Sequence, residues 1–185
     1  MFMNNSLKIV FLILIGALGF ISCSKKSDNP VGPTAPTTEL KITLNGGGFN
    51  NQQITFSTGI GGYAITENIT YAQFLAAQGG DTLLCYISYS GKQTGNQAWD
   101  LENTGVLLYE YGNSGTIILT PANGSTNITS YGNVGSNITG TFSGTLQDAS
   151  AQNISISGTF SVQRSADIQT IGGESKINSQ RQNIK

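Results

Sequence analysis

The chain has no histidine, and cysteine occurs only twice in its 185 residues. The absence of histidine excludes Ser-His-Asp and Cys-His catalysis, imidazole-based zinc sites and the commonest general base near neutral pH. Charged side chains make up only 10% of the chain, against about 25% in an average soluble domain. The formal net charge of −1 provides no basic stripe for nucleic-acid binding. We therefore expect no nucleic-acid partner, no cofactor and no metal.

Few cysteines also mean that no disulfide framework is available to hold the fold together. Cys85 lies in the apolar segment 82–89, where Leu83, Ile87 and Tyr89 share its face if the segment is a strand. A lone cysteine in such a pattern is typical of a buried, inert thiol. The hydrophobic core itself must stabilise the domain.

The N-terminal part has the pattern of a secretory signal. Lys8 precedes an uncharged apolar run from Ile9 to Ile21. As a helix this run would be roughly 20 Å long, which is too short for a bilayer core of about 30 Å. A basic flank, a short apolar run and the small residue Ser22 predict a cleaved signal peptide over residues 1–22.

The segment Phe20-Ile-Ser-Cys23 resembles the lipobox of bacterial lipoproteins. The resemblance implies cleavage before Cys23 and acylation of this residue (diacylglycerol on sulfur, palmitate-type chains), because two or more chains anchor a protein stably. Residues 23–38 contain three of the four prolines and no apolar periodicity, which predicts a flexible linker. We expect a cell-envelope protein anchored to the outer membrane, with the leaflet left open.

The clearest fold signal is a repeat near the end of the chain. The segments 138–146 and 154–162 both contain Gly-Thr-Phe-Ser, and apolar or glycine positions alternate with hydroxyl residues throughout each. Strict alternation indicates half-buried strands, and the short polar loop between the segments predicts an antiparallel hairpin.

The remaining body, residues 39–166, shows further short strand patterns separated by Gly/Asn turns. Tyr71–Gln78 is the one segment with helical spacing, Pro121–Gly124 is expected to interrupt a strand, and 167–185 reads as a loosely ordered polar tail. Many short strands without α/β alternation predict an all-β fold, a single antiparallel β-sandwich. A small calycin-like β-barrel is the alternative. A sandwich leaves strand edges open to pair with a protein partner.

Candidate functional residues begin at the only tryptophan, Trp99. Asp100 and Glu102 follow it, two positions apart, so on a strand they share one face with about 6.5–7 Å between Cα atoms. Such a pair suits a carboxylate-dependent glycosidase, or a ligand-binding or calcium site with Asn103. The bland interpretation is a solvated acidic loop that holds the tryptophan against the edge of the core.

Tyr109 and Tyr111 lie close in sequence to Trp99, and they share a strand face with Leu107. Exposed aromatic rings beside Asp and Asn are suited to stacking on sugars. The alternative is that both tyrosines are half-buried strand residues with their hydroxyls at the rim. Trp99, Asp100, Glu102, Tyr109 and Tyr111 thus form the candidate ligand-binding set.

The signal with Cys23 and the repeat over residues 132–164 together resemble small lipoproteins of unknown function common in Bacteroidetes, which end in a Gly-Thr-Phe-Ser hairpin. This resemblance implies an envelope lipoprotein and says little about activity. We expect a non-catalytic binding or scaffolding module, not an enzyme. A carbohydrate-binding lipoprotein with an aromatic surface is the alternative, and a glycosidase is the third hypothesis.

Overall fold

Antiparallel strands account for most of the described chain. The computed structural model describes residues 37–100, 103–113 and 115–169, and no helix occurs among them. That part of the chain therefore contains no helix capable of crossing a membrane. Its strands are β1 (Glu39–Gly46), β2 (Phe49–Phe56), β3 (Thr58–Ala64), β4 (Ile69–Gln78), β5 (Asp81–Ser90), β6 (Gly95–Ala98), β7 (Gly105–Gly112), β8 (Gly115–Tyr131), β9 (Asn137–Gln147) and β10 (Asn153–Ile168).

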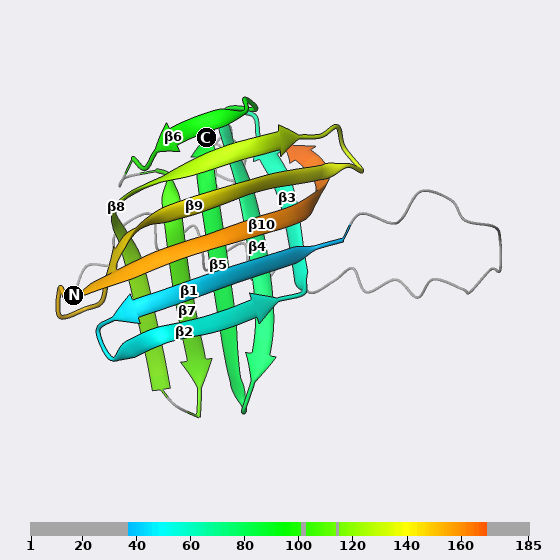
Figure 1. The fold of residues 1–185 in the computed structure, drawn as a ribbon. Coiled ribbons are helices and arrows are strands. Elements are labelled where there is room, and N and C mark those ends of the chain that lie inside the picture. Colours follow the sequence, from blue (N-terminus) through cyan, green and yellow to red (C-terminus); the bar gives the residue numbers. More distant parts are fainter. Residues whose placement is uncertain (1–36, 101–102, 114, 170–185) are drawn as a thin grey trace, which may run out of the picture. The chain divides into compact units, whose positions relative to one another are not determined.

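The strands lie in two layers, and those of one layer run across those of the other (Figure 1). The front sheet contains β2, β1, β10, β9, the second half of β8 and β6, in that order. The back sheet contains β3, β4, β5, β7 and the first half of β8. The core lies between the sheets and includes Leu44, Phe56, Phe74, Cys85 and Leu119. Cys85 is fully buried, and burial raises the pKa of its thiol, as an inert cysteine requires.

Two strands, β8 and β10, take part in both sheets. β8 pairs with β7 up to Leu119 and with β9 from Thr120 onward, with a bulge between Pro121 and Asn123. β10 pairs with β9 up to Gln163 and then runs parallel to β3 from Arg164, again with an irregularity. Bulges bend and twist a strand, which lets it pass from one layer to the next. The result is a sandwich joined at two corners and not a clean barrel, so the predicted sandwich is confirmed.

The repeat hairpin forms as predicted. β9 and β10 pair over their whole common length, with Phe142 opposite Gly158 and Gly140 opposite Phe160. Ile138, Phe142 and Leu146 are buried, whereas the intervening hydroxyl residues are exposed or half-buried. The alternation of apolar or glycine residues with hydroxyl residues therefore correctly predicted both strands and which of their faces is buried.

Two local predictions are wrong. Tyr71–Gln78 is not a helix: it lies within β4, which pairs with β3 on one side and β5 on the other. Pro121–Gly124 does not end a strand, because β8 bends there and continues to Tyr131. The strand β10 also runs to Ile168, two residues beyond the predicted domain boundary, and residues 170–185 of the predicted tail lie outside the described part.

Candidate binding face

Trp99 is a core residue. Its side chain is only 8% exposed, and the indole Nε1 donates a hydrogen bond to Thr126 Oγ1 at 2.9 Å. The ring covers Gly124 and Gly144, which face each other across β8 and β9. A Cβ atom at either glycine would lie 2.6 or 2.5 Å from Cζ3 of the indole. Because the ring is enclosed, Trp99 drops out of the predicted ligand-binding set.

Asp100 is exposed and stabilises the turn that leads into β7. Its carboxylate accepts a hydrogen bond from Asn103 Nδ2 at 3.0 Å. Its backbone N–H donates to Thr104 Oγ1 at 2.7 Å, and its carbonyl accepts the Thr104 N–H. Glu102 and the predicted lipid-attachment residue Cys23 lie outside the described residues, so the carboxylate pair and the lipid anchor remain predictions. The described ranges hold no group of three or more acidic or cysteine residues suited to a metal ion.

Tyr109 and Tyr111 lie together as predicted. Both project from β7 on the side of the back sheet that faces away from the core, with ring centroids 5.8 Å apart and planes tilted by 45°. Tyr109 is half-buried and Tyr111 is 41% exposed. The structure therefore keeps the tyrosine pair and separates it from Trp99, which lies inside the core.

The two tyrosines belong to a larger apolar surface. In paired strands, residues that lie directly opposite each other point to the same face of the sheet. We call the outer face of this sheet the tyrosine face; its larger side chains are Ile60, Tyr71, Gln73, Leu75, Leu84, Tyr86, Leu107, Tyr109, Tyr111 and Ile118. The described strands β3, β4, β5, β7 and β8 contribute no charged side chain to this face, but Glu67, between β3 and β4, lies near its Tyr86.

Several large side chains of the tyrosine face are open to solvent. Ile60 is 40% exposed, Leu75 37% and Tyr111 41%, and they come from three different strands. Scattered exposed apolar residues are ordinary, whereas a continuous exposed patch marks an interaction site. Here the three exposed side chains lie around buried neighbours, among them Tyr71 and Leu84. Sequence reasoning found only Tyr109 and Tyr111 here, because the remaining members become neighbours only through strand pairing.

The centre of the tyrosine face is itself partly buried. Tyr71 and Tyr86 stack with centroids 6.4 Å apart and planes within 8°. Burial, followed by the nearby Tyr71 and Glu67, raises the pKa of Tyr86. Gln73 lies directly opposite Tyr86 and is 7% exposed. Its amide oxygen has no hydrogen-bond partner within the described residues, which is unfavourable for a buried acceptor.

The outer face of the front sheet is chemically different. Lys41 and Glu39 form an exposed ion pair at 2.9 Å, and most other side chains there are hydroxyls: Thr43, Thr55, Thr139, Thr141, Ser143, Thr145, Ser155, Ser157, Thr159 and Ser161. A shallow groove of about 460 Å³ crosses β2, β1 and β10 between two rows of these side chains. The outer face of the front sheet is thus hydrophilic, whereas that of the back sheet is mostly apolar.

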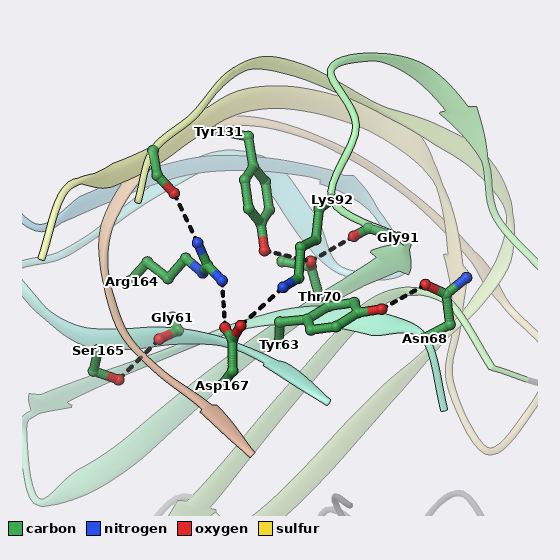
Figure 2. A network of polar contacts seen from close by, with 11 residues as sticks. Gly61, Tyr63, Asn68, Thr70, Gly91, Lys92, Tyr131, Arg164, Ser165 and Asp167 are labelled. Carbon is green, nitrogen blue, oxygen red and sulfur yellow. Dashed lines mark hydrogen bonds and ion pairs between the residues drawn. The ribbon is translucent and has the colours of Figure 1, made fainter. Parts of the chain in front are cut away.

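A polar cluster holds the corner where β10 joins β3 (Figure 2). Asp167 accepts hydrogen bonds from Lys92 Nζ at 2.8 Å and from Arg164 Nη2. Lys92 also lies over the ring of Tyr63, 4.1 Å from its centroid, and Arg164 lies over that of Tyr131. The Lys92 hydrogen bond is the main reason that the pKa of Asp167 lies below its ordinary value. No sequence pattern predicts this cluster, because Asp167 belongs to the segment expected to form a polar tail.

Further contacts tie the same corner to the loop after β5. Thr70 Oγ1 donates to the carbonyl of Gly91 at 2.6 Å and lies 3.1 Å from the Tyr131 hydroxyl. Arg164 Nη1 donates to the carbonyl of Gly132 at 3.1 Å. Arg164 is 6% exposed, so its charge is neutralised mainly by Asp167. These contacts fix the strands at the corner, although the buried Nε of Arg164 has no hydrogen-bond partner within the described residues.

The strand order also shows where the sheet is open. Within the described chain, β2 pairs only with β1, and the four-residue β6 pairs only with β8. Residues Phe49–Phe56 of β2 carry no charge and no proline, so this edge lacks the usual protection against pairing. Asn51 has a φ of 47°, which interrupts a regular extended edge in the first half of the strand.

No protein-family model matches the chain, and neither a curated protein nor a solved structure matches it.

Proposed function

We propose that this protein is a lipid-anchored, non-catalytic binding or scaffolding module of the bacterial cell envelope, and that it binds through the tyrosine face. The single observation that carries the proposal is the exposure of three large apolar side chains on this one face, Ile60, Leu75 and Tyr111. Leaving such a surface in water is unfavourable at about 25 cal/mol per Å². A partner that covers it gains that free energy.

The anchor in this proposal is Cys23, on the basis of the Phe20–Cys23 segment and the apolar run before it. The linker up to residue 38 would allow the domain to present either face to a neighbour. Replacing Cys23 by serine should abolish incorporation of labelled palmitate and release the protein from the membrane fraction. Retention of the label in Cys23→Ser would overturn the anchor.

The binding role is tested by photo-crosslinking in intact cells. p-Benzoylphenylalanine in place of Tyr111 should yield a covalent adduct, because the ring is exposed in the proposed interface. The matched position is Thr141, which is exposed on the hydroxyl face of β9 and should yield none. Equal yields from the two positions, or none from Tyr111, would count against the tyrosine face as the binding surface.

Carbohydrate binding is the second candidate, favoured by the tilted Tyr109–Tyr111 pair at the exposed end of β7. Two neutral aromatic rings with free hydroxyl edges can stack on a sugar and hydrogen-bond to it. Affinity electrophoresis through neutral polysaccharides tests this role. Retardation that Tyr111→Ala removes would support it. Trp99→Ala is not a useful probe, because the loss of a buried indole would unfold the core.

A further inference from the structure

We propose that the domain docks on the surface of the lipid bilayer that holds its anchor, through two apolar turns at the end of the domain where the linker joins it. This inference rests on the proposed function, because the lipid on Cys23 is what brings the domain to the bilayer. The turns are residues 65–68, between β3 and β4, and residues 133–136, between β8 and β9. We call these two segments the docking turns.

The docking turns carry the two most exposed large apolar side chains of the described chain. Val134 is 55% exposed and Ile65 is 45% exposed, at positions where turns usually have polar residues or glycine. Each turn is closed by a hydrogen bond from the backbone N–H of its last residue to the carbonyl oxygen of its first, at 3.3 and 2.8 Å, respectively. Gly135, with a φ of 91°, supplies the positive φ that places Val134 at the outer corner of its turn. A fixed backbone therefore holds both side chains in solvent.

Both docking turns are fastened to the last part of β10. The Gly135 N–H donates to the carbonyl of Arg164 at 2.8 Å, and the Ile65 N–H donates to that of Ile168 at 2.9 Å. These two acceptors are four residues apart, which is at most about 13 Å along an extended strand. The two apolar side chains are thus near enough to meet one flat surface together.

The linker joins the domain at the same end. Asn137 Nδ2 donates to the carbonyl of Thr37 at 3.1 Å, next to the second docking turn. Figure 1 shows β1 starting on the side of the front sheet where β8 and β9 connect. Cys23 precedes Thr37 by fourteen positions, so even a fully extended chain keeps Thr37 within about 50 Å of the lipid anchor. Such a tether holds the docking turns at a high effective concentration near the bilayer.

The turns at the opposite ends of β1, β4 and β9 are chemically different. They comprise residues 47–48, 79–80 and 148–152, respectively. The first two are pairs of glycines, and the third contains only Asp, Ala, Ser and Gln. These three turns therefore contain no large apolar residue. An unrelated scatter of exposed apolar residues would not divide the two ends in this way, whereas a contact with the bilayer at the linker end requires it.

The charges around the docking turns balance. Lys92 and Arg164 both pair with Asp167, and Glu67 belongs to the first docking turn. Two cations and two anions leave no net charge, whereas attraction to anionic lipid needs clustered basic side chains. The occupant of this end is therefore the interfacial region of a neutral bilayer, which Ile65 and Val134 enter with their apolar side chains.

The test uses the full-length lipidated protein, purified from membranes and reconstituted in vesicles of neutral phosphatidylcholine. Val134→Cys is labelled with nitrobenzoxadiazole, and Cys85 is buried and should not react. Lipids with a doxyl group on the acyl chain should quench the dye at position 134. Ala149→Cys is the matched variant, exposed in the turn between β9 and β10, and its dye should stay unquenched. Mass spectrometry of the same sample shows whether Cys23 carries acyl chains.

Ile65→Asp, combined with the dye at position 134, tests whether the two turns act together. It should shift the equilibrium between the docked and the free domain at least about tenfold toward the free state. Leu75→Asp makes the same exchange in the second half of β4, where the side chain is 37% exposed, and should leave the quenching unchanged. Resistance to protease checks that each variant is folded.

An unquenched dye at position 134 in acylated, vesicle-bound protein would overturn the inference and leave the anchor intact. Equal quenching at positions 134 and 149, or full quenching in Ile65→Asp, would do the same. Shielding of the dye by added envelope proteins, but not by lipid, would assign the docking turns to a protein partner and would also overturn it. A protein that carries no acyl chain on Cys23 and does not bind the vesicles would overturn both the anchor and the inference.

Discussion

Phe142 of β9 lies directly opposite Gly158 of β10, and its ring occupies the space where a side chain at position 158 would begin. A Cβ atom at Gly158 would lie 2.5 Å from Cζ of this ring and 2.6 Å from the carbonyl oxygen of Lys41. Phe160 and Gly140 repeat the arrangement one step along the ladder, with a closest approach of 2.8 Å. The Gly-Thr-Phe-Ser repeat thus encodes two complementary ring and glycine pairs.

Gly158→Ala should therefore destabilise the domain by about 1–3 kcal/mol, as expected for overpacking of a close-packed core. The backbone carbonyl cannot move away as a flexible side chain could, so repacking of Phe142 alone should not relieve the clash. Chemical denaturation measures the change. The matched control is Ser157→Ala, on the exposed face of the same strand, which should stay within about 0.5 kcal/mol of wild type. Equal midpoints for the two variants would contradict the proposed packing.

The sequence predicted those parts of the fold in which one strand face is buried and the other is wet. β9 and β10 are such strands, and their alternation gave the hairpin and its inward residues. β4 is different, because Phe74 points into the core whereas Tyr71 and Leu75 lie on the tyrosine face. A strand with apolar residues on both sides loses its period of two, and accidental helical spacing then misleads.

The candidate site was predictable only where its residues are neighbours in sequence. Tyr109 and Tyr111 are two apart on one strand, so their shared face followed from β geometry alone. Ile60, Leu75 and Ile118 join them through the register of five strands, which no local pattern specifies. Trp99 shows the opposite error: its polar sequence neighbours suggested exposure, whereas the glycines that make room for its ring, Gly124 and Gly144, lie far along the chain.

The buried hydrogen bond between Trp99 Nε1 and Thr126 Oγ1 provides a second prediction. Thr126 is fully buried, so Thr126→Val leaves the indole N–H without an acceptor and should cost about 1–3 kcal/mol. Thr126→Ser keeps the hydroxyl and should cost less. Trp99 is the only tryptophan, so its fluorescence reports unfolding of this region directly. Equal stability of the two variants would show that the hydrogen bond contributes little.

The corner cluster predicts a dependence of stability on acidic pH. Hydrogen bonds from Lys92 and Arg164 hold the pKa of Asp167 below its ordinary value of 3.8. The folded state therefore releases this proton more readily than the unfolded state does. The resulting stabilisation is complete above the ordinary pKa, and it is lost as pH falls through the lower folded value.

Asp167→Asn should remove that part of the acid dependence. The thermal midpoint of the wild type should fall more steeply below about pH 4 than that of the variant. Lys92→Gln removes the larger of the two influences and should flatten the curve in part. Parallel curves for wild type and Asp167→Asn would mean that the corner cluster makes no pH-dependent contribution.

Tyr86 predicts the opposite behaviour at alkaline pH. Burial in the tyrosine face raises its pKa above the ordinary value of 10.0, so the folded state keeps a proton that the unfolded state loses. The stability associated with this proton is complete below pH 10 and declines as pH rises toward the folded value. Relative to wild type, Tyr86→Phe should reduce the alkaline slope of the unfolding free energy by up to about 1.4 kcal/mol per pH unit.

Denaturation curves collected from about two pH units below to about one unit above the ordinary tyrosine value near 10 would measure this slope. Tyr89→Phe should act in the same direction, because burial likewise raises the pKa of Tyr89 within the core. If wild type and Tyr86→Phe lose stability in parallel, Tyr86 ionises as readily in the folded protein as in the unfolded chain. The centre of the tyrosine face would then be open to water in the folded protein.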